Sequence, residues 1–153
     1  MRLTAFSDVT LRVMMLLSAT ESGTKLTSAQ IADGVGTPYN HVTKSVTRLS
    51  SLGLVDASRG RGGGVSITAV GLKETVGHLL RELERDQAMV ECEASSGTCP
   101  MDHDCHLRSA LRRAREAFYA ELDDVIISEL PHRRQMGPIM IPLGLEPPPD
   151  CLV

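Results

Sequence analysis

Residues 27–55 read TSAQIADGVGTPYNHVTKSVTRLSSLGLV, and this stretch decides the fold. A hydroxyl cap at Thr27 or Ser28 begins a short helix, which two glycines stop. A threonine–proline pair then supplies a cap and a first-turn proline for a longer helix over residues 38–52. A short helix, a tight turn and a longer helix are the pattern of a helix-turn-helix motif.

The longer helix has one apolar face and one polar face. Val42, Val46 and Leu49 recur at three- and four-residue steps and predict the buried side. The opposite side carries donors suited to base edges and phosphate groups, and no acidic side chain. Plain packing of two helices is the alternative. The candidate DNA contacts on the two helices are Ser28, Tyr39, Asn40, His41 and Thr43, with Lys44 and Arg48 assigned to phosphate.

A β-hairpin is predicted directly after this helix. Two short strands, residues 54–58 and 65–68, flank the sequence RGRGGG, and its glycines suit a turn that needs positive φ. Arg59 and Arg61 project from the tip, where they can contact phosphate or enter a minor groove. A phosphate-binding glycine loop is the alternative, but no helix follows directly and no GK[ST] motif is present. Helices and hairpin together predict a winged helix-turn-helix that binds DNA.

Three further helices are expected around this motif, so the fold class is mainly α with a small β-hairpin wing. Residues 5–20 are amphipathic, with Thr4 as a plausible cap. Residues 72–87 and 105–130 have leucine-rich faces. The last helix has a coiled-coil-like seam, which favours a dimer interface, with packing inside one chain as the alternative. The seam residues are Leu107, Leu111, Ala114, Phe118, Leu122 and Val125.

The chain is expected to divide into three parts. Residues 1–70 form the DNA-binding domain, and residues 71–130 form a cysteine loop with the dimerisation helix. Residues 131–153 hold six of the eight prolines, which predicts an extended or disordered tail. Cys151 lies in that tail, and we expect it to have no part in the site.

Charge and composition narrow the class of protein. Residues 1–68 hold seven Lys and Arg against four Asp and Glu, whereas residues 69–153 hold nine against fifteen. Only the first part therefore suits a polyanion. The longest apolar run near the N-terminus is Val13 to Leu17, too short for a signal or a membrane span. We expect a cytoplasmic protein with reduced thiols. The histidines are scattered and no nucleophile motif is present, so we do not expect an enzyme.

Three of the four cysteines lie in one polar loop, at Cys92, Cys99 and Cys105. The gaps of six and five residues are too wide for a zinc knuckle and suit thiolates that bind different irons of a cluster. The last cysteine lies where the long helix starts, and a helix N-terminus favours anionic ligands. A zinc site and a thiol redox switch are the alternatives. Candidates for a fourth ligand are Asp102, His103, Asp104, His106 and Asp8.

In this order of elements the chain resembles the bacterial iron–sulfur winged-helix regulators, a family that includes the nitric-oxide sensor NsrR and IscR. The likeness is carried by LTAFSDVTLR (3–12), TPYNHVTKSVTRLSSLGLV (37–55), RGRGGGVSI (59–67) and the three cysteines. The opening with Asp8 and Arg12 is more similar to the NsrR type. Where IscR-like members have a ligand histidine, three residues after the last cysteine, this chain has Arg108.

The resemblance implies a cluster held by Cys92, Cys99 and Cys105, with Asp8 of the partner subunit as the oxygen ligand and Arg12 orienting it. A 4Fe–4S cluster is preferred and a 2Fe–2S cluster is possible. The function implied is a homodimeric repressor on a palindromic operator, which cluster nitrosylation releases from double-stranded DNA. A regulator that senses cluster supply or redox state is the first alternative. A small electron-transfer protein is the second.

Overall fold

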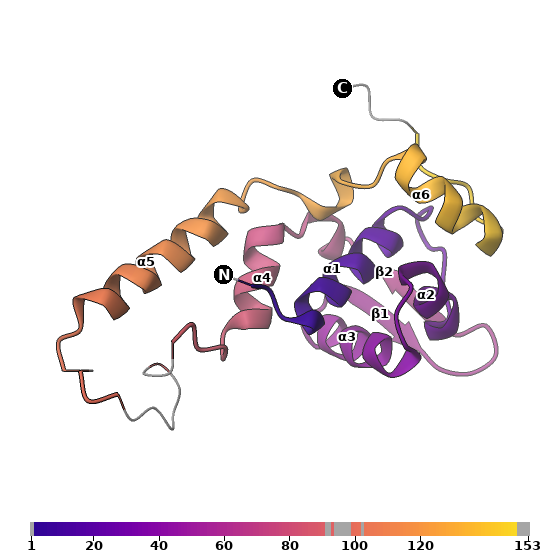
Figure 1. Cartoon of the computed structure of the whole chain (residues 1–153). Helices are drawn as coiled ribbons and strands as arrows, with labels where there is room; N and C mark the ends of the chain where they lie inside the picture. The colour runs from indigo at the N-terminus through magenta and orange to yellow at the C-terminus, as the bar shows by residue number, and fades with distance from the viewer. Residues whose placement is uncertain (1, 91–92, 94–98, 102, 150–153) are drawn as a thin grey trace.

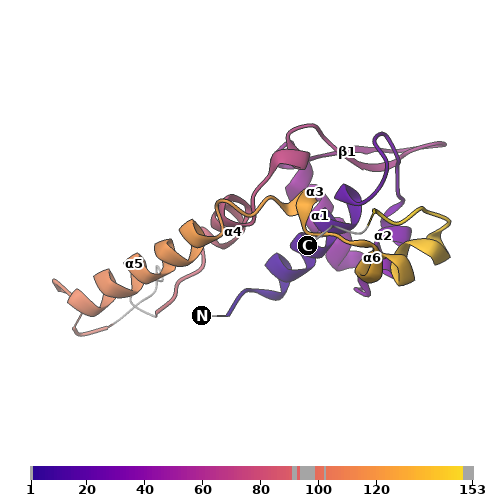
Figure 2. The same cartoon turned by 90° about the horizontal axis from the view of Figure 1, so that it is seen from above.

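The computed structural model describes residues 2–90, 93, 99–101 and 103–149. Figure 1 shows α1, α2, α3, α6 and the hairpin gathered into one body, with α4 beside α1 and α5 reaching away from them. Seen from above in Figure 2, α5 again projects from the body at the end opposite to the hairpin. The elements in chain order are α1 (Ala5–Ser18), α2 (Ser28–Val35), α3 (Tyr39–Ser51), β1 (Val55–Ser58), β2 (Gly64–Ile67), η1 (Gly71–Lys73), α4 (Val76–Glu84), α5 (His106–Glu121), η3 (Ile127–Glu129), α6 (Arg133–Met140) and η4 (Ile141–Leu143).

The helix-turn-helix is confirmed as α2 and α3. Thr27 and Gln30 form a reciprocal capping box at the start of α2, and Gly36 ends it in the left-handed conformation. The predicted cap on α3 is wrong. Pro38 precedes that helix without a side-chain cap, and the hydroxyl of Thr37 donates backwards to the carbonyl of Val35 at 3.4 Å. The hydroxyl of Thr37 thus bonds toward the end of α2, and Pro38 has no polar side-chain atom that could cap α3 in its place.

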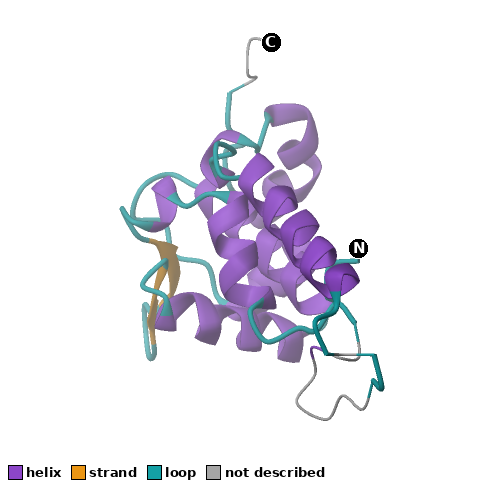
Figure 3. Ribbon diagram, turned by 90° about the vertical axis from the view of Figure 1, so that its left-hand side faces the viewer, coloured by secondary structure: helices purple, strands orange, loops and turns teal. Residues whose placement is uncertain are grey.

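The wing, residues 55–67, is an antiparallel hairpin at one edge of the molecule, shown in orange in Figure 3. Its register runs from Val55 opposite Ile67 to Ser58 opposite Gly64. The bounds of both strands lie within one residue of the predicted ones. Gly60, Gly62 and Gly64 all have positive φ, as the turn required. The strand pair is tied to the body by the Leu26–Val65 bridge.

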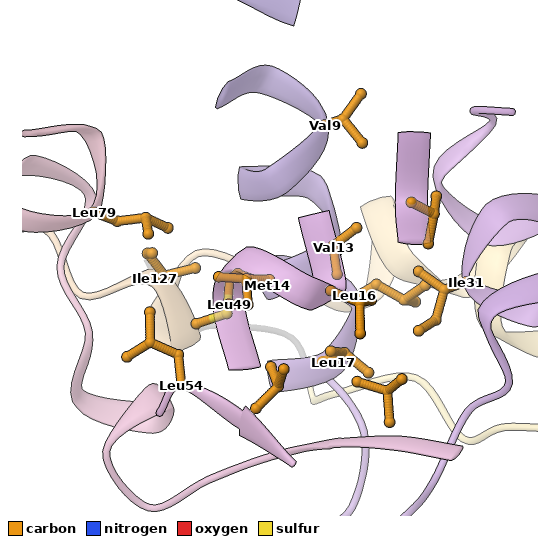
Figure 4. Packing of buried hydrophobic residues seen from close by; sticks show 14 of the residues in the cluster. Val9, Val13, Met14, Leu16, Leu17, Ile31, Leu49, Leu54, Leu79 and Ile127 are labelled. Carbon is orange, nitrogen blue, oxygen red and sulfur yellow. The ribbon is translucent and has the colours of Figure 1, made fainter. Parts of the chain in front are cut away.

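The core is built around α1, which contacts α2, α3, α4 and η3. Figure 4 shows how its buried side chains pack. Val13, Met14 and Leu17 are fully buried there. They pack with buried aliphatic side chains that come from every neighbouring element. Each such side chain contributes about 1.5–3 kcal/mol of burial free energy. The labelled members of this cluster include Ile31, Leu49, Leu54, Leu79 and Ile127.

Two predicted helices are shorter than expected. In place of one helix over 72–87, a 3-10 turn precedes α4, which Thr75 caps by accepting from the N–H of His78. The helix predicted over 105–130 ends at Glu121. The chain turns there because the carbonyls of Leu122 and Val125 accept from the first N–H groups of α4. Leu122 and Val125 therefore leave the predicted seam.

The prediction of an extended tail is wrong for residues 133–143, which form α6 and η4. Met136 and Met140 of α6 are buried. The helix packs on α2, where Gly34 leaves room for Ile139 and Leu143. Apolar side chains at three- and four-residue steps thus outweigh the prolines. Cys151 lies outside the described residues. Within the described chain, no helix has the length and apolar character needed to cross a membrane.

Candidate nucleic-acid interface and cysteine site

A groove of about 570 Å³ lies between the start of α2, the outer face of α3 and the wing. Four of the predicted DNA contacts line it: Ser28, Tyr39, Thr43 and Arg59. The structure adds Thr47, one turn after Thr43, which the sequence analysis passed over although it shares that helix face. Hydroxyl groups and an arginine around a concave surface are suited to phosphate and base edges.

The other predicted contacts lie around this groove. Asn40, His41 and Lys44 are exposed on α3, and Arg61 is exposed at the tip of the wing. Tyr39 is 55% exposed, so its ring and hydroxyl are open to a partner on this face. The structure thus brings α3, the second helix of the helix-turn-helix and its recognition helix, onto one face with the wing.

Arg48 differs from the other predicted contacts. Its Nη2 donates to the backbone carbonyl of Glu82 on α4 at 3.0 Å and lies 3.6 Å from that residue's carboxylate. Its guanidinium is therefore directed toward α4, and the assignment to phosphate has no support from this geometry.

Asp8 and Arg12 form the expected ion pair along α1, with Arg12 Nη2 at 2.5 Å from Asp8 Oδ2. Both side chains are about half exposed, so the pair faces outward from the body.

The start of α1, one turn before Asp8, is held by the buried carboxylate of Glu84 on α4. It accepts from the N–H and hydroxyl of Thr4 and from the hydroxyl of Ser7. The sequence analysis did not anticipate this anchor.

Two of the three predicted cysteine ligands lie in the described residues. Cys99 and Cys105 are free thiols and partly buried. Cys105 is the residue before α5 and caps nothing with its side chain, as expected for a group left available at a helix N-terminus. Cys92 lies outside the described residues. Among the residues that are described, no three His, Cys, Asp or Glu side chains come together.

The loop before Cys99 is linked to α5 by Glu93. One carboxylate oxygen of Glu93 accepts from the N–H of Met89 and from Arg115. Its other oxygen, Oε1, is buried and has no hydrogen-bond partner among the described atoms. Buried carboxylate oxygens normally accept a hydrogen bond, so the described residues alone do not satisfy this atom.

The C-terminal end of α5 is joined to α4 by Arg81, which pairs with Glu116 of α5 and with Asp123 just after it. Its guanidinium donates to both carboxylate oxygens of Asp123 at 2.6 and 2.8 Å, and these bonds lower the pKa of Asp123. Burial raises the pKa of Tyr119, and the nearby Glu84 adds to the effect. Two residues of the predicted seam on α5 are exposed to solvent in the single chain: Leu107 is 66% exposed and Phe118 is 39% exposed.

The sequence profile of the Rrf2 family, described as "Iron-dependent Transcriptional regulator", matches residues 3–133. The chain is 44% identical over 148 residues to the HTH-type transcriptional repressor NsrR of Streptomyces coelicolor, covering 96% of this chain and 99% of that protein. It is 34% identical over 131 residues to the HTH-type transcriptional regulator NsrR of Geobacillus kaustophilus, covering 85% and 89%.

Two solved structures share the fold. CymR of Staphylococcus aureus, in an oxidized form, superposes with a TM-score of 0.62 at 20% identity, covering 85% of this chain and 95% of that one. IscR of T. potens superposes with a TM-score of 0.64 at 17% identity, covering 85% of each chain. At these identities the likeness concerns the fold, and it confirms the winged helix-turn-helix architecture.

Proposed function

The chain belongs to the Rrf2 family of iron-dependent transcriptional regulators, and on this premise we propose that it is a homodimeric repressor whose iron–sulfur cluster senses nitric oxide. The observation that carries the proposal is the near full-length 44% identity to a repressor, combined with a recognition helix and a wing on one face. A regulator of this kind acts on the chromosome, so we place it in the cytoplasm. Family membership argues against the electron-transfer alternative and against an enzyme.

On the DNA side, α3 would enter the major groove with Tyr39, Asn40 and Thr43 toward base edges. Lys44 and the two wing arginines would neutralise phosphate. Two copies related by a two-fold axis would read a palindromic operator. The open seam of α5, with Leu107 and Phe118 exposed, offers the second copy an apolar surface.

On the cluster side, the donor set fits an iron–sulfur group. The thiols of Cys99 and Cys105 are free, Cys105 immediately precedes the first residue of α5, and Cys92 would complete the set. When bound, the cluster would supply iron that reacts with nitric oxide. Three thiolates and one carboxylate favour a 4Fe–4S cluster over a 2Fe–2S cluster.

We assign the carboxylate to Asp8 of the partner subunit. Within one chain, Figures 1 and 2 both show the N-terminal end of α5 set well apart from α1. The Asp8 side chain is half exposed and held by Arg12, so it is presented outward. Because α1 packs along α3, release of Asp8 would free the recognition helix to change its position.

A mixed dimer tests this assignment. Asp8→Ala subunits keep their cysteines and Cys105→Ala subunits keep Asp8, so a dimer of one each has a single complete site only if Asp8 acts across the interface. After anaerobic reconstitution of differently tagged subunits, we expect one wild-type-like site per mixed dimer by absorbance and Mössbauer spectroscopy. Asp124→Ala, at an exposed turn, is the matched control. A mixed dimer without any wild-type-like site would refute ligation across the interface.

The sensing of nitric oxide is tested separately. DNA binding by the anaerobic, cluster-loaded protein is followed by fluorescence anisotropy during additions of nitric oxide, O₂ or an iron chelator. We expect nitric oxide to release the DNA at concentrations near stoichiometric with the cluster. Release by chelator or O₂ but not by nitric oxide would favour the alternative, a regulator of cluster supply or redox state. A colourless, iron-free protein that binds its operator fully would refute both.

A further inference from the structure

The last turn of α4 contacts two elements of the DNA-binding body. Glu84 holds the start of α1 through Thr4 and Ser7. Glu82, on another side of the same turn, holds α3 through Arg48. The chain enters the cysteine loop directly after this turn. A shift of the loop's first residues therefore acts on α1 and α3 at the same place.

The contact between Arg48 and Glu82 is built from two groups. The carbonyl of Glu82 is one of the last four of α4, which have no partner inside the helix, and Arg48 Nη2 donates to it at 3.0 Å. The carboxylate of Glu82 lies 3.6 Å from the same nitrogen and also pairs with Arg85. Glu82 is only 19% exposed and Arg48 39%, so water screens this link less than a fully exposed pair.

The direction of Arg48 also separates it from the DNA-facing side chains of α3. Thr43 and Thr47 line the groove and Lys44 is exposed, whereas Arg48 crosses to α4. Both contacts use Nη2 and direct the guanidinium toward α4, and Arg48 is not among the residues that line the groove. The geometry therefore favours a role inside the protein.

We propose that Arg48 is a positioning residue that couples the cysteine loop to the recognition helix through the last turn of α4. This inference rests on the proposed function, because it names the contact through which the state of the loop reaches the DNA-reading surface. With the loop held in its ligand-bound state, the end of α4 fixes α3 at the orientation that fits the major groove. When the loop loosens, that restraint on α3 weakens.

Two measurements distinguish coupling from phosphate contact. The first is the slope of log affinity against log salt between about 50 and 200 mM, which falls by about one for each phosphate contact removed. The second is the ratio of operator affinities between cluster-loaded and chelator-treated protein. Both are measured for the wild type, Arg48→Gln and Glu82→Gln. Lys44→Gln, on the exposed side of the same helix, is the control for a phosphate contact.

We expect Arg48→Gln to keep the wild-type salt slope and to reduce the affinity ratio by about fivefold or more, the scale of a coupling between sites. Glu82→Gln should change the ratio in the same direction but less, since its backbone carbonyl remains. Lys44→Gln removes one phosphate contact from each subunit, so it should lower the slope by about two for the dimer and leave the ratio unchanged. A lowered slope in Arg48→Gln would overturn the inference, and so would an unchanged ratio. A wild-type ratio near one would refute the proposed function itself, and this outcome is read from the wild type alone.

Discussion

The anchor of α1 on Glu84 gives a prediction whose size follows from the structure. Glu84 is 8% exposed and accepts three hydrogen bonds, from the N–H of Thr4 at 3.0 Å, the hydroxyl of Thr4 at 2.9 Å and the hydroxyl of Ser7. In Glu84→Ala the groups of Thr4 are near enough to the surface to bond to water. Ser7 is fully buried and would lose its acceptor.

A buried donor without its partner costs about 1–3 kcal/mol, and each hydrogen bond to a charged group contributes about 1.5–3 kcal/mol. The contributions of three bonds to one carboxylate do not add in full. Removing the carboxylate also removes its own desolvation penalty, which opposes the loss. We therefore expect Glu84→Ala to lower the free energy of unfolding by about 2 kcal/mol. For a chain of this size that corresponds to a fall in Tm of roughly 4–8 °C.

The assay is urea unfolding of the apo protein followed by circular dichroism, supported by thermal melting. Glu84→Gln keeps one acceptor oxygen and should lose about half as much. Glu21→Ala, in an exposed loop, is the matched control and should stay within about 0.5 kcal/mol of the wild type. If Glu84→Ala proved as stable as the wild type, desolvation of the carboxylate would outweigh its hydrogen bonds and the anchor would be no stabilising feature.

Three further outcomes are expected. Met140→Ala removes a fully buried side chain of α6 and should cost about 2–5 kcal/mol in urea unfolding, whereas a loose tail would show no change. Because hydrogen bonds from Arg81 lower the pKa of Asp123, their stabilisation is complete above about pH 4, the ordinary value, and is lost as the pH falls through the lower folded-state value. The difference in Tm between the wild type and Asp123→Asn should therefore be largest near neutral pH and shrink below about pH 4, and a difference that grows in acid would contradict this. Arg61→Gln at the wing tip removes one contact from each subunit, so it should lower the salt slope of DNA binding by about two for the dimer, and an unchanged slope would remove Arg61 from the phosphate contacts.

Much of the DNA-binding body was predictable from local signals. The capping box at Thr27, the glycines of the wing and the apolar steps of α1 and α3 each act within a few residues, and each element appeared within two residues of its expected bounds. The same kind of signal misled where a longer-range contact decided the outcome. The helix after Cys105 stops at Glu121 because the carbonyls of Leu122 and Val125 accept from the N–H groups of Gly77 and Val76, which start α4 much earlier in the chain.

The candidate site divides along the same line. The residue types and spacing of the cysteines, of Asp8 with Arg12 and of the basic outer face of α3 are properties of the sequence, and so is the expectation of DNA binding that follows from them. Only the tertiary structure directed Arg48 toward Glu82 across 34 residues and placed Glu84 beneath Thr4 across 80 residues. It also packed α6 on α2. Periodicity and capping fix a residue's face on its own helix, but the partner that a polar side chain meets depends on which two surfaces burial brings together.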